Sequence, residues 1–253
     1  MDRLRRSEES IFGCCGGPGD HRAGLQSQAM HAVMGLLAAN GQAQGEVLYR
    51  GSEILGLPPA KLNRLRGTKI TMIFQDPLTS LTPHMRCGRQ ITEVLTEHLG
   101  VSRRDADARA LEMLERMRIT EAKRRLRQYP HELSGGMRQR IMIAIAMISR
   151  PDVLIADEPT TALDVTVQAQ ILDLMRELQR DFKTALILIT HGVAGMCDRV
   201  QAMRGGVFVE EGCARDIFSS PSHDYTRMLI EATLQAWIAS GGAACGGSAC
   251  GEC

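Results

Sequence analysis

The sequence predicts an α/β fold, in which a largely parallel sheet is covered by helices. Short runs of aliphatic and β-branched residues alternate with longer amphipathic segments along most of the chain. Two of the short runs, "DVLIAD" at 152–157 and "TALILIT" at 184–190, are almost continuously apolar, as strands buried on both faces are. The segment between them, 165–182, repeats apolar residues at helical spacing, so the three together indicate a strand–helix–strand unit.

The remaining elements are predicted from the same periodicities and from the Gly, Pro and Asn residues that bound them. The predicted helices cover 27–38, which ends at Asn40-Gly41, 86–128, 135–150 and 165–182. The predicted strands cover 45–51, 69–75, 152–157 and 184–190, with a loop at 76–83. A hairpin is expected around Gly205-Gly206, and the glycine-rich tail from Ser240 is expected to be disordered.

Composition excludes several classes of protein. The 253 residues, 44% hydrophobic and 23% charged, are enough for one globular domain or one domain with a small appendage. Thirty basic and 29 acidic residues give a net charge of +1, so no nucleic-acid partner is expected from the charge balance. The longest apolar runs fall short of the ~20 residues that cross a bilayer. No secretory signal is evident at the start, so we expect a cytoplasmic location and reduced cysteines.

The cysteines of the tail allow one sharper hypothesis. Cys245, Cys250 and Cys253 have the C-x4-C-x2-C spacing of three ligands in plant-type 2Fe–2S proteins. A fourth ligand is not evident, and small residues surround the three. A tail that binds no cluster is therefore favoured.

Two adjacent carboxylates follow the strand at 152–157. In "VLIADEP" (153–159) the apolar run ends at Asp157 and Glu158, at the strand edge where parallel sheets bind ligands. Asp157 is a candidate Mg²⁺ ligand, through water, and Glu158 is a candidate general base for a nucleophilic water. An ordinary buried strand that meets an acidic loop is the alternative.

The stretch "HELSGGMRQR" (131–140) is a more specific indication of a binding site than the two carboxylates. Ser134, Gly135 and Gly136 stand at the start of the predicted helix, where unpaired backbone N–H groups and the helix dipole attract anions. A serine N-cap explains Ser134 but not the two glycines, which cost about 1 kcal/mol each against alanine inside a helix. We therefore expect an anion site here.

These stretches occur together with three others in a recognisable order. "IFQDP" (73–77), "LSGGMRQR" (133–140), "VLIADEP", "TALD" (161–164) and "LILITH" (186–191) follow the order found in ABC-type ATPases. Over roughly residues 27–234 the chain resembles the nucleotide-binding subunit of ABC importers. The resemblance implies that ATP and Mg²⁺ are bound by a P-loop-like core sheet with a helical signature subdomain at about 77–150. It places the ATPase domain at 1–239 and the tail at 240–253.

The same resemblance assigns roles to single residues. It implies that Glu158, His191 and Gln75 are catalytic, and that Ser27, Gln75 and Asp157 hold the metal. The implied nucleotide-binding residues are Gly24, Gln26, Ser27, Ser134, Gly135, Gly136, Gln139 and Asp164. Gln75 offers an amide oxygen to Mg²⁺, and His191 can donate a hydrogen bond to the γ-phosphate.

The segment 216–234 indicates which subgroup of ABC importers the chain resembles. Its "SPSHDYT" (220–226) resembles the "SPxHPYT" element of dipeptide, oligopeptide and nickel importer subunits, with Asp224 in place of the usual proline. An amphipathic helix that begins after Ser-Pro is the alternative. "MIFQDPLTSLTP" and "GLLAANG" favour the same group.

The phosphate-binding loop departs from the family pattern G-x-x-x-x-G-K-S/T. In "GDHRAGLQSQAM" (19–30), one register places Gln26 at the lysine and Ser27 at the Mg²⁺-binding hydroxyl. The other register keeps Gly19-x4-Gly24 but puts Leu25 and Gln26 at the last two places. Neither contains the lysine that neutralises the phosphates, and one lost charge-assisted contact costs about 1.5–3 kcal/mol.

The segment ahead of this loop also departs from the family. It is shorter than in the family, which suggests missing N-terminal strands and a frame-shifted or mis-called start. Phe12 is a weak candidate for the aromatic that stacks on adenine.

Three functions are therefore considered. The first is an importer ATPase subunit at the cytoplasmic face of the membrane. It would pair with membrane permease subunits and with a second ATPase subunit, head to tail, and indirectly with a solute-binding protein. The second, a DNA-repair ABC ATPase, is disfavoured because the 57 residues between Gln75 and Leu133 are too few for a long coiled coil. The third is a catalytically impaired half-site that supplies its signature motif to a partner.

Overall fold

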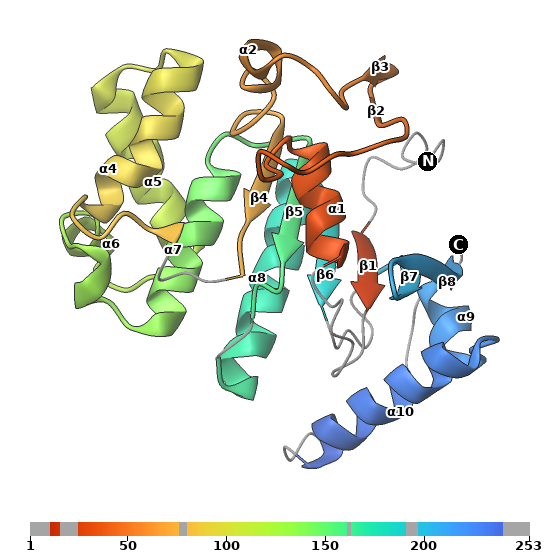
Figure 1. The fold of residues 1–253 in the computed structure, drawn as a ribbon. Helices are drawn as coiled ribbons and strands as arrows, with labels where there is room; N and C mark the ends of the chain where they lie inside the picture. The colour runs from red at the N-terminus through yellow and green to blue at the C-terminus, as the bar shows by residue number, and fades with distance from the viewer. Residues whose placement is uncertain (1–10, 16–24, 76–79, 161–162, 191–196, 240–253) are drawn as a thin grey trace.

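The fold is described from a computed structural model, which covers residues 11–15, 25–75, 80–160, 163–190 and 197–239. In these residues a six-stranded sheet has the order β4-β5-β6-β1-β7-β8 (Figure 1). Its strands are β1 Ile11–Cys15, β4 Ile70–Ile73, β5 Val153–Asp157, β6 Ala185–Thr190, β7 Arg199–Arg204 and β8 Val207–Cys213. All neighbours run parallel except β7 and β8, so the predicted α/β class with a largely parallel sheet is confirmed.

Strand β1 occupies a central position that the sequence analysis did not predict. It pairs in parallel with β6 on one side and with β7 on the other, so that Phe12 lies opposite Ile187 and Arg199. Phe12, considered above as a residue ahead of the phosphate loop, thus lies inside a strand that joins the two halves of the sheet.

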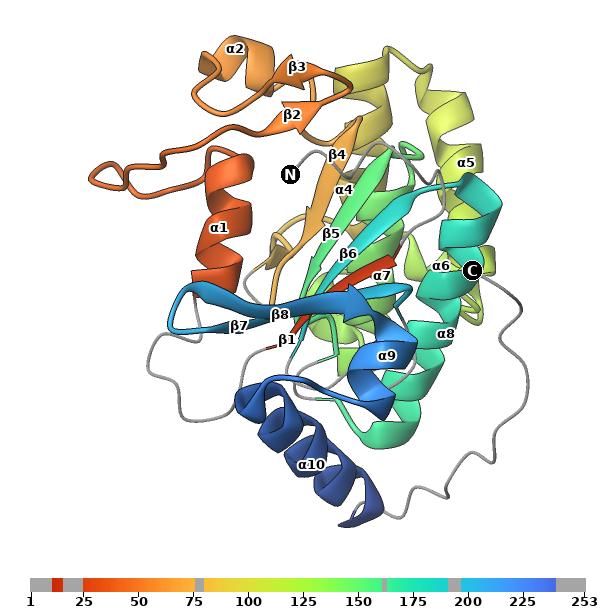
Figure 2. The ribbon, with the colours of Figure 1, turned by 90° about the vertical axis from the view of Figure 1, so that its right-hand side faces the viewer.

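Two layers of helices cover the sheet. Helix α1, Leu25–Val33, lies on one face and helix α8, Val165–Phe182, lies on the other (Figure 2). Because successive strand residues point to opposite faces, Ile155 and Ile189 belong to the small apolar cluster on the α1 side. Leu154 of β5 instead joins the large cluster beneath α8 and α7, Gly135–Met147.

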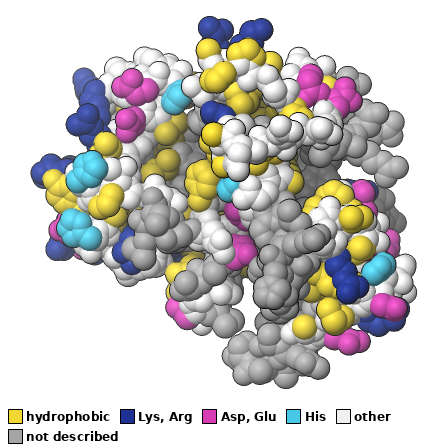
Figure 3. Space-filling view, viewed as in Figure 1, with side chains coloured by type: hydrophobic (Ala, Val, Ile, Leu, Met, Phe, Trp, Pro, Cys, Tyr) yellow, Lys and Arg dark blue, Asp and Glu magenta, His cyan; other side chains and the backbone are white. Residues whose placement is uncertain are grey.

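The predicted helical stretch 86–128 is confirmed, but it is broken into shorter pieces. It contains α4 Cys87–Glu93, a π-helical turn Val94–His98, α5 Arg103–Arg116 and α6 Ala122–Arg125, and a short 3-10 turn Pro130–Glu132 precedes α7. Left-handed residues separate the pieces: Gly100 has φ +62°, Arg118 +55° and Glu121 +54°. Figure 3 shows basic side chains gathered along the outer edge of this helical part.

Two predicted boundaries are wrong. Helix α1 ends at Val33 and turns at Gly35, which has φ +59°, rather than at Asn40-Gly41. The single strand expected over 45–51 is a short hairpin of β2 Leu48–Tyr49 and β3 Ser52–Glu53. Its two turn residues, Arg50 and Gly51, both have positive φ, as a type I′ turn requires.

The hairpin contacts Asp152, the residue just before β5. The Tyr49 hydroxyl donates a hydrogen bond to the Asp152 carboxylate, and the Arg50 guanidinium lies 2.9 Å from the same group. Burial of the phenol, then its hydrogen bond to Asp152, raises the pKa of Tyr49 to about 12. A short helix α2, Pro59–Leu62, follows.

The C-terminal part matches the predicted hairpin around Gly205-Gly206 and continues into α9 Ala214–Ser219 and α10 Asp224–Ala239. The Glu210 carboxylate of β8 accepts hydrogen bonds from the backbone N–H groups of Ser222 and His223, at 2.7 and 3.1 Å, just ahead of α10. Asp224 is the first residue of that helix, where a carboxylate is favoured by the helix dipole. Among the described residues, we find no helix with the length and apolar character that a membrane span needs.

Candidate functional site

The carboxyl end of β5 carries the first group of predicted site residues. Asp157, the last residue of the strand, is 4% exposed. Its Oδ1 accepts a hydrogen bond of 2.8 Å from the Oγ of Ser27, which lies in the first turn of α1. The sheet thus brings together a hydroxyl and a carboxylate that are 130 residues apart in the chain.

The second contact of this group joins β4 to β5. Gln75 follows the end of β4 by two residues, and its Nε2 donates a hydrogen bond of 2.9 Å to Oε2 of Glu158. Glu158 has φ +46°, a conformation that a non-glycine residue rarely adopts, and its backbone N–H donates to the Ile189 carbonyl at 2.8 Å. The backbone therefore turns sharply at Glu158, and adjacent carboxylates are placed in different settings, one bonded to Ser27 and one to Gln75.

The start of α7 carries the second group. Ser134 is the N-cap, and its Oγ accepts a long hydrogen bond of 3.4 Å from the N–H of Met137. Gly135 and Gly136 are the first two helical residues. A Cβ on Gly136 would lie 3.2 Å from the side chain of Val167 in α8, so close helix packing is one reason for that glycine. The nearest atom to a Cβ on Gly135 would be 3.8 Å away, so packing does not require a glycine there.

The start of α8 lies against the start of α7. Asp164 is the N-cap of α8, and its carboxylate accepts a hydrogen bond of 3.0 Å from the Val167 N–H. Val167 is the same residue that approaches Gly136, and Leu163 is the nearest contact for a Cβ on Gly135. The positive ends of two helix dipoles are thus close to one another, which favours an anionic ligand.

Two other predicted residues are buried, and two lie outside the described residues. Gln139 is 2% exposed, so its side chain lies in the interior and not on the surface beside Ser134; its amide nitrogen has no hydrogen-bond partner among the described residues. Gln26 is also buried, at 6% exposure. Gly24 and His191 lie outside the described residues, as do the tail cysteines.

Two polar residues that the sequence analysis did not select support the second group. Gln168 of α8 donates hydrogen bonds from its Nε2 to the carbonyls of Thr160 and Leu163, and so holds the chain ahead of Asp164. Arg140 of α7 donates to the Met117 carbonyl at 2.8 Å and to Gln170 at 3.0 Å. Burial, and then the charge of Arg118, lowers the pKa of Arg140. The position of each residue in its helix was predictable, but its partner was not.

Comparison with a family model decides what this arrangement is. Residues 27–161, which contain Ser27, Gln75, the start of α7 and the end of β5, match the model described as ABC transporter. The chain belongs to the ABC transporter family. The predicted family is thereby confirmed, and nucleotide binding is the property that this family model and the neighbours below support.

Curated relatives of this ABC chain are ATP-binding proteins of peptide transport. It is 53% identical to the oligopeptide transport ATP-binding protein OppD of Haemophilus influenzae over 210 residues, which are 82% of this chain and 65% of that protein. It is 54% identical to OppD of Escherichia coli over 82% of this chain and 62% of that protein. With DppD of Lactococcus lactis the identity is 46%, over 81% and 60%. The match thus spans less than two thirds of the length of these relatives.

Solved structures agree with the fold of the ABC chain. The ATP-binding cassette MJ0796, in a dimeric post-hydrolysis state bound to ADP and Pi, is similar with a TM-score of 0.70 and 26% identity. The similarity covers 83% of this chain and 87% of that one. The predicted ABC-type nucleotide-binding fold is therefore confirmed.

Proposed function

We propose that this chain is the ATP-binding subunit of an ABC importer, which couples ATP binding and hydrolysis to the uptake of peptides or similar solutes. The single observation that carries the proposal is the pair of hydrogen bonds at one sheet edge, Ser27 to Asp157 and Gln75 to Glu158. The names of the relatives support the solute class, as does the "SPSHDYT" element at the start of α10. The solute itself is selected by the membrane and solute-binding subunits.

The donors at this edge suit Mg²⁺. A hydroxyl, a carboxylate and an amide oxygen are hard oxygen ligands of the kind that Mg²⁺ prefers. Asp157 is buried and so costly to leave uncompensated, which supports a cation beside it. In this proposal Ser27, Asp157 and Gln75 would hold the ion, and Gln75 keeps its Oε1 available because its Nε2 bonds Glu158. When bound, Mg²⁺ would neutralise charge on the β- and γ-phosphates.

We propose that Glu158 acts on water. Its carboxylate lies beyond the end of β5 and accepts a hydrogen bond from Gln75, which fixes the orientation of the acceptor oxygens. We assign it the role of general base for the attacking water. By the family likeness, His191 would donate a hydrogen bond to the γ-phosphate.

In this proposal the starts of α7 and α8 bind a second nucleotide. Ser134, Gly135, Gly136 and Asp164 would bind the phosphates of ATP held by a second ATPase subunit, in a head-to-tail dimer. The dimeric state of the MJ0796 neighbours supports this arrangement. Membrane permease subunits, and through them a solute-binding protein, are the further partners, and the site of action is the cytoplasmic face of the membrane.

The phosphate loop favours a second candidate, the impaired half-site. The hydrogen bond from Ser27 to Asp157 supports the register in which Gln26 stands at the lysine position, and Gln26 is neutral and buried. A lost contact of about 1.5–3 kcal/mol weakens nucleotide affinity by about 10- to 150-fold. The start of α7 would then complete the nucleotide site of a partner subunit whose phosphate loop is intact.

Equilibrium binding of a fluorescent ATP analogue with Mg²⁺ distinguishes these functions. The purified chain is compared with a variant whose residues 19–27 are rebuilt as a standard phosphate loop, and with Asp157→Asn in both backgrounds. Micromolar binding by both chains, weakened by Asp157→Asn, supports a complete importer ATPase site. Micromolar binding by the rebuilt variant alone assigns the half-site. If neither binds, or if Asp157→Asn has no effect, the proposed nucleotide site is wrong.

A further inference from the structure

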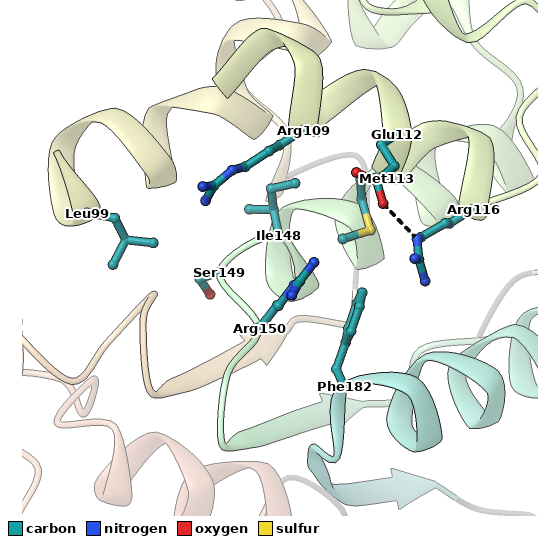
Figure 4. A pocket seen from close by; sticks show the side chains of 9 residues that line it. All are labelled: Leu99, Arg109, Glu112, Met113, Arg116, Ile148, Ser149, Arg150 and Phe182. Carbon is teal, nitrogen blue, oxygen red and sulfur yellow. Dashed lines mark hydrogen bonds and ion pairs between the residues drawn. The ribbon is translucent and has the colours of Figure 1, made fainter. Parts of the chain in front are cut away.

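A cavity lies at the far ends of the two helices that start at the candidate site. Its volume is about 250 Å³, and Figure 4 shows the side chains that line it. Ile148, Ser149 and Arg150 come from the chain just after α7, and Phe182 is the last residue of α8. Because α7 and α8 have 13 and 18 residues, at about 1.5 Å per residue this cavity lies about 20–27 Å from their starts. It is therefore separate from the proposed nucleotide site.

The cavity has an excess of positive charge. Three arginines line it, at positions 109, 116 and 150, against one carboxylate, Glu112. Arg116 is already neutralised, because it lies 3.3 Å from Glu112 and 3.1 Å from Asp181. Arg109 and Arg150 have no ion-pair partner within the described part of the chain. Two guanidinium groups are thus available to an anion that enters.

A buried hydroxyl at the same place is also unsatisfied. Ser149 lines the cavity, and its Oγ is shielded from solvent and has no hydrogen-bond partner in the described residues. A buried polar atom without a partner costs free energy, so such groups are rare and mark places where a ligand or water completes the site.

The rest of the lining is apolar. Met113 and Ile148 are 5% and 6% exposed, and the Phe182 ring lies beside them (Figure 4). The guanidinium carbons of Arg116 and Arg150 lie 5.5 and 5.2 Å from the centroid of this ring. The aromatic ring therefore orients both arginines and offers contact surface to an apolar or aromatic body.

Helix capping explains only part of this arrangement. Cations are favourable near helix C-termini, which accounts for Arg150 just beyond α7. It does not account for Arg109, which lies in the middle of α5, or for the unsatisfied hydroxyl of Ser149. Arg150 also has φ +52°, a conformation in which glycine is the ordinary choice and an arginine is strained.

We propose that this cavity binds a small organic oxyanion, a phosphate or carboxylate group carried on a compact apolar or aromatic body. Arg109 and Arg150 hold the charged group, and Met113 and Phe182 contact the body. The volume lies just below the ~300–1,000 Å³ of pockets for drug-sized ligands, so a body of about one ring fits. The occupant would contact α5, α7 and α8 together.

Calorimetric titration of the full chain with phenyl phosphate tests this proposal, with benzoate, inorganic phosphate and phenol as comparison probes. We expect binding of phenyl phosphate or benzoate that is at least tenfold tighter than that of inorganic phosphate or phenol; whichever binds more tightly identifies the anionic group. Arg109→Gln and Arg150→Gln should each weaken binding at least tenfold. Arg104→Gln, an exposed arginine of α5 outside the cavity, is the matched control and should change affinity less than twofold.

Several results would overturn the proposal. They are absence of binding by both aromatic anions, equal weakening by Arg104→Gln, or equal affinity for inorganic phosphate. Asp157→Asn should leave the affinity for phenyl phosphate unchanged, and a loss of binding in that variant would place the probe in the nucleotide site instead. If Arg150→Gln lowers the unfolding temperature, the test rests on Arg109→Gln, because replacements at exposed positions usually change stability by less than about 0.5 kcal/mol.

Discussion

Replacing Ser27 with alanine removes the hydrogen bond that joins α1 to the end of β5. The acceptor, Asp157, is 4% exposed, so bulk water has little access to replace the lost donor. A hydrogen bond to a charged group contributes about 1.5–3 kcal/mol to stability. The better helix propensity of alanine returns about 0.5 kcal/mol. We therefore expect the free energy of unfolding to fall by about 1–2.5 kcal/mol.

Urea unfolding of the nucleotide-free chain, followed by circular dichroism, measures this change directly. For a domain of this size each kcal/mol lowers the unfolding temperature by about 2–4 °C, so a thermal scan should show a decrease of about 2–10 °C. Ser27→Thr keeps the hydroxyl and is the control; it should retain most of the stability. If the alanine variant unfolds within 0.5 kcal/mol of the parent, Ser27 and Asp157 are not coupled as described, and the magnesium site built on them loses its support.

Two further predictions concern stability. The neutral Tyr49 phenol, whose pKa is raised to about 12, stabilises the fold fully below pH 10, and that stabilisation is lost as the pH rises through 12. Urea unfolding between about pH 9 and 12 should therefore show a steeper loss of stability in the parent than in Tyr49→Phe, and equal slopes would contradict the shift. A Cβ on Gly88 would lie 2.7 Å from the Leu126 carbonyl oxygen, so Gly88→Ala should destabilise by about 1–3 kcal/mol. Gly135→Ala meets no atom nearer than 3.8 Å and should stay within about 0.5 kcal/mol, and similar losses in the two variants would refute the packing argument.

Periodicity predicted those elements whose burial pattern is strong. Helix α8 has the predicted bounds of 165–182, and strands β5 and β6 differ from their predictions by one residue at the start. In each case apolar residues alone define the buried face, so local pattern and tertiary packing agree. Periodicity failed at Gly35, because the helical pattern continues past it while the backbone turns at positive φ.

Strand β1 could not be predicted from hydrophobic periodicity. The stretch "IFGCC" is short, includes a glycine, and lies between segments without a regular pattern. Its extended conformation is set by pairing with two strands that are far along the chain. Leu186 of β6 pairs with it on one side and Arg199 of β7 on the other. Such a strand is formed by its context and not by its own propensity.

The candidate site was predictable as a set of residue types but not as a set of contacts. The motifs selected Ser27, Gln75, Asp157 and Glu158, and the sheet order then paired hydroxyl with carboxylate and amide with carboxylate. Gln139 was selected by the same motif logic, yet it is buried, because the fourth residue after Gly135 faces the core of the α7 packing. A motif gives positions along a helix, whereas burial depends on what packs against each face.

The central place of β1 has a consequence for biosynthesis. Ile11 pairs with Leu186, 175 residues later, so the sheet cannot close until most of the chain has left the ribosome. At translation rates of about 5–20 residues per second, that delay is about 9–35 s. Throughout this interval β1 has neither of its neighbouring strands, and its N–H and C=O groups are open to pairing with other chains. The nascent protein should therefore depend on a chaperone that shields β1 until β6 and β7 are complete.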